Sequence, residues 1–192
     1  MKFFMDANDE VLISVMERVK GFILEMMEEN DRAIVIVGAA NIDFLLRRLI
    51  EQSLLPRLDK GKDELLDNDS PLSSFSSRIN FCYRLGLVDK EFCRLLHILR
   101  RIRNDFAHNI KSCDLNSSPR SDRVGEICEF LKNSMLLIEL RKFFPSNGPK
   151  MHSRDFRIML SLFVSLLEMK LHHMPKIMKA NPVAISWIPL KV

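Results

Sequence analysis

The residues best suited to chemistry lie in one short run near the middle of the sequence, where Arg103 and His108 stand five positions apart. A guanidinium can hold a phosphate, and an imidazole can take up or release a proton near neutral pH. Such a pair suits metal-free cleavage of RNA, in which a base activates the ribose 2′-hydroxyl and a cation stabilises the charged phosphorane. Asn104 and Asp105 would support the pair. An arginine and a histidine at this spacing also occur by chance, so a structural role stays open.

The pattern around Arg103 places this arginine on the buried side of a helix. The apolar residues of the segment recur at steps of three and four: Phe92, Leu95, Leu96, Leu99, Ile102 and Phe106. A guanidinium on such a stripe needs a carboxylate, a phosphate or a water-filled cleft. Asp43 stands in a similarly apolar neighbourhood, so we expect Asp43 and Arg103 to approach each other, with Asn41 or Asn104 completing the hydrogen bonds.

A purely structural explanation of the same residues is equally consistent with the sequence. A buried ion pair between Asp43 and Arg103 would fix how two helices cross without doing any chemistry. His108 near the end of its helix would then interact with the helix dipole and with free carbonyls.

The composition is that of an ordinary globular protein rich in helix. Of the 192 residues, 47% are apolar and 28% are charged, and the chain has only six glycines. The length favours a single domain over residues 1–192. The net charge of +4 permits a polyanionic partner but does not argue for one. We therefore expect an all-α fold, a single compact bundle of about six helices.

Apolar spacing and capping residues place the elements of this bundle. The expected helices cover about residues 8–29, 31–53, 72–85, 89–108, 121–137 and 153–173. Asp31 and Asp89 are the expected N-caps of the second and fourth helices, Pro71 falls near the first turn of the third, and Gly86 ends it. A loop is expected at 109–120, and further loops around 56–69 and 145–149.

Two further segments, one around Gly38 and one at the C-terminal end, also allow structural predictions. Gly38, with Ala39 and Ala40, predicts a close crossing of helices, because a nucleotide-binding turn would require a second glycine and later β-branched strands. The C-terminal helices at 121–174 are followed by an irregular apolar tail at 175–192. Such a tail usually packs on its own domain or on a partner subunit.

The cysteines and the apolar runs exclude several classes of protein. Cysteines stand at 82, 93, 113 and 128, and no two have the two-residue gap of a zinc or redox motif. Cys82 and Cys93 lie among apolar residues and are expected to be buried free thiols. We expect no bound metal and no cofactor. No apolar stretch reaches the roughly 20 residues of a membrane span, and the start turns acidic early, which predicts a cytoplasmic protein.

Three stretches resemble the mannitol operon repressor family: Pro71–Ile79, Tyr83–Val88 and Leu95–His108. That family's pattern has a small-polar entry, a helix that closes on Leu-Gly-Leu, and a helix that ends in Ile-Arg-Asn-x-Phe-Ala-His. Residues 102–108 fit this ending without a gap, and the resemblance covers about residues 33–108. It implies a helical regulator of sugar-alcohol genes that acts through a protein partner or as a homodimer, without an ordinary DNA-reading motif.

The same ending is similar to the arginine–histidine signature of HEPN domains, a superfamily of helical bundles. Many HEPN proteins are ribonucleases or toxins with a site built across a dimer, whereas others only bind nucleotides or proteins. This second resemblance implies that Arg103 and His108 are catalytic and that Asn104, the polar residue after the arginine, supports them. A regulatory protein and a metal-independent endoribonuclease therefore both stay open.

A third possibility is direct DNA binding through residues 78–97, which fit a helix-turn-helix template with its turn at Gly86. The recognition helix would open with Asp89, Lys90 and Glu91, and the carboxylates of Asp89 and Glu91 would repel DNA phosphates. An RNA-binding surface could involve the basic stretch His172–Lys176 together with Lys179, although a solvated helix end explains that stretch equally well.

Overall fold

The computed structural model describes residues 10–57, 61–109, 114–143 and 150–178. These residues form seven helices and no strand: α1 (Glu10–Glu28), α2 (Asp31–Ser53), α3 (Phe75–Arg84), α4 (Lys90–His108), α5 (Arg120–Leu131), α6 (Met135–Phe143) and α7 (Met151–His173). The all-α prediction is confirmed, and α1, α2, α4 and α7 match their expected ranges within two residues. None of the helices in this part of the chain has the length and apolar character needed to cross a membrane.

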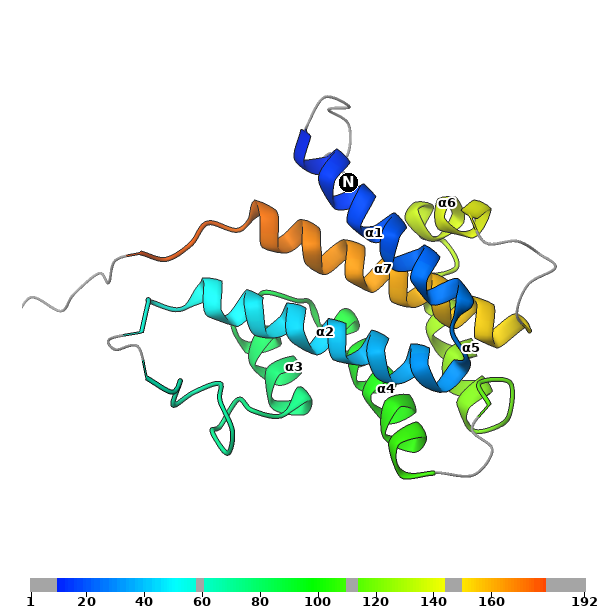
Figure 1. Ribbon diagram of the computed structural model, residues 1–192, viewed down its shortest axis with the longest axis horizontal. Coiled ribbons are helices and arrows are strands. Elements are labelled where there is room, and N and C mark those ends of the chain that lie inside the picture. Colours follow the sequence, from blue (N-terminus) through cyan, green and yellow to red (C-terminus); the bar gives the residue numbers. More distant parts are fainter. Residues whose placement is uncertain (1–9, 58–60, 110–113, 144–149, 179–192) are drawn as a thin grey trace, which may run out of the picture.

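The long helix α7 lies at the centre, and both α1 and α2 pack against it (Figure 1). The helices α2 and α7 run in the same direction, because Ser153 bonds Asp31 at their starts and Gln52 bonds the Leu171 carbonyl at their ends. Their close approach occurs at Gly38, where an added Cβ would lie 2.5 Å from Leu160 Cδ1. The predicted helix crossing at this glycine is confirmed.

The middle of α7 is buried on every side. All residues from Phe156 to Ser165 are buried, because α1, α2, α5 and α6 each contact this helix. The hydroxyls of Ser161 and Ser165 donate to the carbonyls four residues earlier, at 2.9 and 2.7 Å, so these polar groups are satisfied inside the core.

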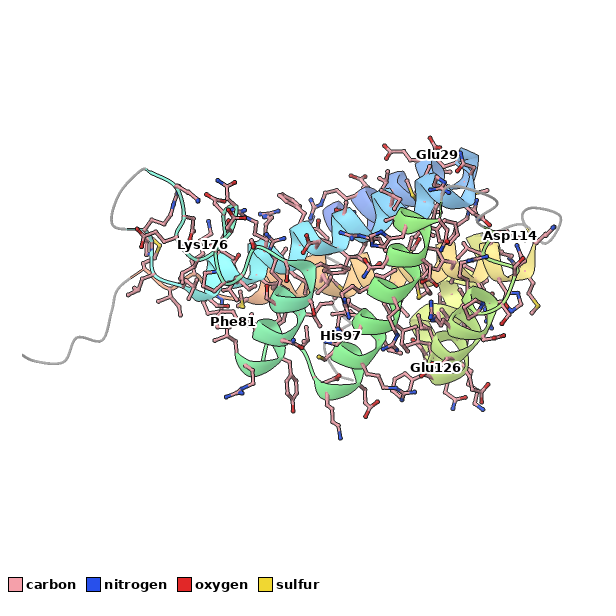
Figure 2. The ribbon with its side chains drawn as sticks, turned by 90° about the horizontal axis from the view of Figure 1, so that it is seen from below. Glu29, Phe81, His97, Asp114, Glu126 and Lys176 are labelled. Carbon is pink, nitrogen blue, oxygen red and sulfur yellow. The ribbon has the colours of Figure 1, made fainter. Side chains whose placement is uncertain are left out.

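The helices α3 and α4 form a hairpin that packs across α2, as Figure 2 shows from below. Gly86 ends the turn with a positive φ of 69°, a conformation that glycine adopts without strain. Asp89 caps α4, because its carboxylate accepts from the Phe92 N–H at 2.7 Å. Both predictions are confirmed. Midway along the hairpin, His97 of α4 and Asn80 of α3 share a hydrogen bond of 2.9 Å.

The predicted N-cap of α2 and the predicted start of α3 are wrong. Asn30, not Asp31, caps α2, and its side chain accepts from the Ala33 N–H at 3.0 Å. Ser74 caps α3, so that Pro71 lies in the preceding turn and not in the first turn of the helix. At the start of α2, Asn30 takes the capping position in place of the next residue, because Asn and Asp can both fill it.

The helix expected over residues 121–137 is two helices, which raises the number from about six to seven. The chain turns between Leu131 and Met135, where the Ser134 N–H donates to the Leu131 carbonyl at 2.8 Å and the Ser134 hydroxyl accepts from the Leu137 N–H at 3.4 Å. Asn133 and Ser134 favour turns and caps over helix interiors, because their side chains bond nearby backbone groups. The tail beyond residue 178 and the loop at 145–149 lie outside the described residues.

Candidate functional site

The end of α4 presents Arg103 and His108 in different environments. Arg103 is half-buried, and its guanidinium donates to the Asn104 side chain at 3.0 Å. His108 is the last residue of α4 and is exposed, and its imidazole makes no hydrogen bond to the described part of the chain. Five residues of α-helix turn the side chain by about 140°, so Arg103 and His108 leave the helix on different sides. Within a single chain, the spacing of five residues therefore does not direct the Arg103 and His108 side chains toward the same point.

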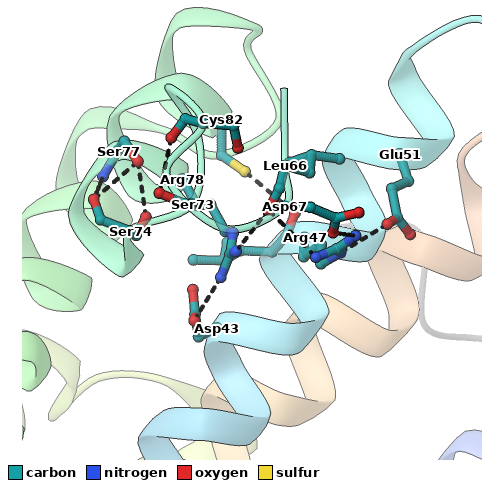
Figure 3. A network of polar contacts seen from close by, with 12 residues as sticks. Asp43, Arg47, Glu51, Leu66, Asp67, Ser73, Ser74, Ser77, Arg78 and Cys82 are labelled. Carbon is teal, nitrogen blue, oxygen red and sulfur yellow. Dashed lines mark hydrogen bonds and ion pairs between the residues drawn. The ribbon is translucent and has the colours of Figure 1, made fainter. Parts of the chain in front are cut away.

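The predicted pairing of Asp43 with Arg103 is wrong, because Asp43 pairs with Arg78 (Figure 3). The Arg78 guanidinium lies 2.6 Å from Asp43 Oδ2 and donates to the Leu66 carbonyl at 3.4 Å. Arg78 is only 8% exposed. It stands in the second turn of α3, the helix that packs beside Asp43 on α2, and so the ion pair fixes α2 against α3 and not against α4.

A second ion-pair group continues this network along α2. The Arg47 guanidinium reaches Glu51 at 2.8 Å and Asp67 at 2.7 Å, and it also donates to the Leu66 carbonyl (Figure 3). The Asp63 backbone N–H and the Arg47 guanidinium lower the pKa of Asp67. These contacts attach the segment before α3 to α2, so the whole network has a structural role.

Arginines from other elements hold the C-terminal end of α4. Arg32 of α2 donates to the Phe106 carbonyl at 2.6 Å and to the Asn109 carbonyl at 2.5 Å. Arg123 of α5 pairs with Asp105, and the Arg120 guanidinium lies 5.7 Å from the centre of the Phe106 ring. Cations are favoured at a helix C-terminus because its carbonyls lack partners within the helix. Asp105, a predicted supporting residue, is therefore part of the contact between α4 and α5.

The face of α4 that looks toward α3 is more polar than the sequence pattern suggested. Arg101 is exposed, but Arg100 is half-buried, and its Nε is buried without a hydrogen-bond partner in the described part of the chain. Burial and the charges of Arg100 and Arg101 lower the pKa of His97. The lowered pKa favours the neutral form of His97, whose ring Nε2 shares the hydrogen bond with Asn80 Oδ1.

The densest polar contacts lie elsewhere, where α1 and α2 meet the start of α7. Arg157 is 3% exposed and donates to the carbonyls of Met26, Glu29 and Ser153 at 3.1, 2.7 and 2.7 Å. It also lies 3.5 Å from Asp31. Sequence reasoning missed Arg157, although its position between Phe156 and Ile158 in an apolar run was a usable signal.

Asp31 links this junction to the loop before α5. Its second carboxylate oxygen accepts from the Ser153 hydroxyl at 2.8 Å and from the Leu115 N–H at 3.1 Å. Asp31, the expected cap, is thus a half-buried residue that connects three segments, because a carboxylate can accept from several donors at once.

A groove of about 570 Å³ lies where the ends of α2 and α7 approach α1. Its lining is mostly polar and charged: Arg18, Arg48, Gln52, Glu168, Leu171, His172, Met174 and Lys176. The sequence had singled out the stretch His172–Lys176 as a candidate RNA surface. The structure adds Arg18 and Arg48 to that stretch, from segments too distant in sequence for spacing to connect. Lys179 lies outside the described residues.

The cysteines of the described chain are free thiols: Cys82, Cys93 and Cys128. Cys82 is buried as expected, whereas Cys93 is only half-buried. Burial raises the pKa of Cys82 to about 12 and, to a similar value, that of Cys128. Since the thiolate is the reactive form, these two thiols are unsuited to nucleophilic chemistry.

Neither a family model nor a curated protein matches the sequence. Among solved structures, the chain is similar to MtlR, the mannitol operon repressor, in the X-ray structure of the MtlR–HPr complex from Escherichia coli. The TM-score is 0.53 and the identity is 17%, over 85% of this chain and 99% of MtlR. At this identity the similarity shows a shared all-α fold, in which nearly the whole of MtlR has a counterpart in this chain.

Proposed function

We propose that this chain is a regulatory protein without enzymatic activity, which acts in transcriptional regulation by binding another protein. The observation that carries this proposal is the fold match to MtlR over 99% of that chain, because MtlR was solved in complex with HPr. We propose HPr as the partner to test first. The resemblance of residues 33–108 to the mannitol operon repressor family supports the same assignment.

The contacts at the end of α4 support a non-enzymatic role. Asp105 is paired with Arg123, and Arg32 satisfies two carbonyls at the same helix end. These contacts attach α4 to α2 and α5, so they serve the packing of the helices. A protein that works by contact needs a rigid scaffold more than it needs an open catalytic cleft.

Isothermal titration of the full chain with purified HPr tests this function. We expect saturable binding to E. coli HPr or to the HPr of the source organism, and none to a small unrelated protein of similar charge. A titration that shows no binding at about 0.1 mM, roughly −5.5 kcal/mol, would contradict the proposal. Sedimentation of the chain alone decides whether a second copy is also a partner.

The alternative function is a metal-independent endoribonuclease that uses Arg103 and His108. Its supporting observation is that His108 is exposed and that Arg103 pairs with no carboxylate among the described residues. Both groups could therefore meet an RNA phosphate, most simply with a second chain completing the site, since their side chains diverge. Asn104 would orient the guanidinium.

RNA cleavage in the presence of EDTA tests the alternative. Cleavage that yields 2′,3′-cyclic phosphate ends, and that is lost in both Arg103→Ala and His108→Ala, would favour the ribonuclease. Lys132→Ala, a substitution at the exposed residue that follows α5, is the control. Absence of cleavage by the wild type would remove this alternative.

A further inference from the structure

The groove between α1, α2 and α7 has walls that are held in place. The Gln52 amide donates to the Leu171 carbonyl at 2.9 Å and also to the Met174 carbonyl. The Ile177 N–H in turn donates to the Gln52 carbonyl at 3.3 Å. The segment after α7, which includes Lys176, is therefore attached to α2 beside Arg48 and ordered before any partner binds.

The groove has more positive charge than its own carboxylate can neutralise. Arg18 and Glu168 form an ion pair of 3.4 Å across it, with the Arg18 side chain 53% exposed. Arg48 and Lys176 are exposed and pair with no carboxylate in the described ranges. A concave surface with charges of one sign concentrates the electrostatic potential. Two cations therefore remain available to a ligand.

The partial negative charges at the C-termini of α2 and α7 are too small to neutralise Arg48 and Lys176. The C-termini of α2 and α7 each contribute about half a negative charge, roughly one charge in all, and the effect fades within one turn. Gln52 already satisfies two of the carbonyls concerned. Two full charges on Arg48 and Lys176 therefore exceed what the helix ends need.

We propose that this groove binds an acidic segment of a partner protein, with one carboxylate at Arg48 and another at Lys176. The inference rests on the proposed function, because it assigns a surface to the protein contact. Phe44 lies 6.0 Å from the Arg48 guanidinium and is 55% exposed, so an apolar side chain of the segment can pack beside the charged one.

The carboxylate of Glu168 favours a protein segment over a nucleic acid. A nucleic-acid backbone has a negative phosphate at every step, and one phosphate would be forced close to this carboxylate. A peptide can place a neutral residue opposite Glu168 and acidic residues on either side. The open form of the groove, bordered by three helices, also suits an extended chain.

A fluorescently labelled peptide with neutral central residues, Glu-Glu-Ala-Ala-Glu-Glu, is the probe, and the polarisation of its fluorescence in the presence of the chain is the measurement. The groove variant is Arg48→Gln with Lys176→Gln. The matched control is Lys20→Gln with Lys170→Gln, which removes the same charge from exposed positions outside the groove. We expect binding to the wild type that weakens at high salt, about tenfold weaker binding to the groove variant, and less than a twofold change in the control.

The proposal would be overturned by no binding to the wild type at low salt, by equal weakening in both variants, or by tighter binding of a hexauridylate than of the peptide. A melting temperature lowered in the groove variant alone would mean that the cations serve the helix ends, and would also overturn it. Titration of HPr with the same proteins distinguishes the proposed acidic-segment site from the proposed HPr partner. If the wild type binds HPr but not the peptide, only this inference fails; if it binds the peptide but not HPr, only the proposed partner fails.

Discussion

Arg157 and Arg103 both interrupt apolar helical stripes, yet the structure surrounds them very differently. Arg157 lies where α1 ends and α7 begins, and it bonds three carbonyls and Asp31. Arg103 lies on the side of α4, and among the described residues its guanidinium donates a hydrogen bond only to the neighbouring Asn104 side chain. The difference arises because converging helix ends expose carbonyls that need donors, whereas the side of a helix has none to offer. A prominent sequence motif therefore need not coincide with the most connected polar group.

The largest expected effect is that of Arg157→Met. The substitution leaves the Asp31 carboxylate and the carbonyls of Met26 and Glu29 without their buried donor, so we expect the free energy of unfolding to fall by about 3–5 kcal/mol. Urea unfolding followed by circular dichroism measures it, and Lys170→Met at an exposed position should change it by less than about 0.5 kcal/mol. A loss below about 1 kcal/mol would show that Arg157 is no more important than a surface residue.

The close contact of α2 with α7 at Gly38 predicts that two glycine-to-alanine substitutions change the free energy of unfolding in opposite directions. Gly38→Ala places a methyl group against Leu160, which is fully buried, and should cost about 1–3 kcal/mol in spite of the gain in helix propensity. Gly21→Ala meets nothing within 4 Å and should stabilise the protein by about 0.5–1 kcal/mol. Thermal unfolding of the two variants gives the comparison. Equal shifts would mean that α2 and α7 are not closely packed at this position.

A smaller effect is expected for Arg103→Ala, which removes a single half-exposed hydrogen bond. The free energy of unfolding should fall by less than about 1 kcal/mol, close to the value for the exposed Arg101→Ala. The same urea titrations measure both variants. A loss approaching that of Arg157→Met would mean that the two arginines contribute equally to stability, and it would remove the contrast on which the structural assignment rests.

The smallest effect is the pH dependence that His97 introduces. Its folded pKa is below the ordinary 6.5, first because of burial and then because of Arg100 and Arg101. The unfolded chain therefore takes up the proton first as pH falls, so the stability from the neutral imidazole is present above about pH 6.5 and is lost below it. We expect the difference in unfolding free energy between about pH 8 and pH 5.5 to shrink in His97→Gln. An unchanged difference would contradict this assignment.

Much of the fold could be predicted because its determinants are local. The start of α4 at Asp89, the turn at Gly86 and the crossing at Gly38 each follow from one residue and its immediate chemistry. The interruption between α5 and α6 was missed, because Asn133 and Ser134 are tolerated inside helices unless packing favours a turn. The candidate site was less predictable, since the groove combines Arg18, Arg48 and Lys176 from three distant segments.

The sequence by itself determined the helices, most of their ends and the residues that face the core, because apolar periodicity and capping act over a few positions. Only the tertiary structure decided which charges meet. Asp43 and Arg78 are 35 positions apart, and Asp43 pairs with Arg78 because α3, and not the Arg103 side of α4, lies against it on α2. A long, flexible and always charged arginine can serve any carboxylate within reach, so its partner is chosen by packing and not by spacing.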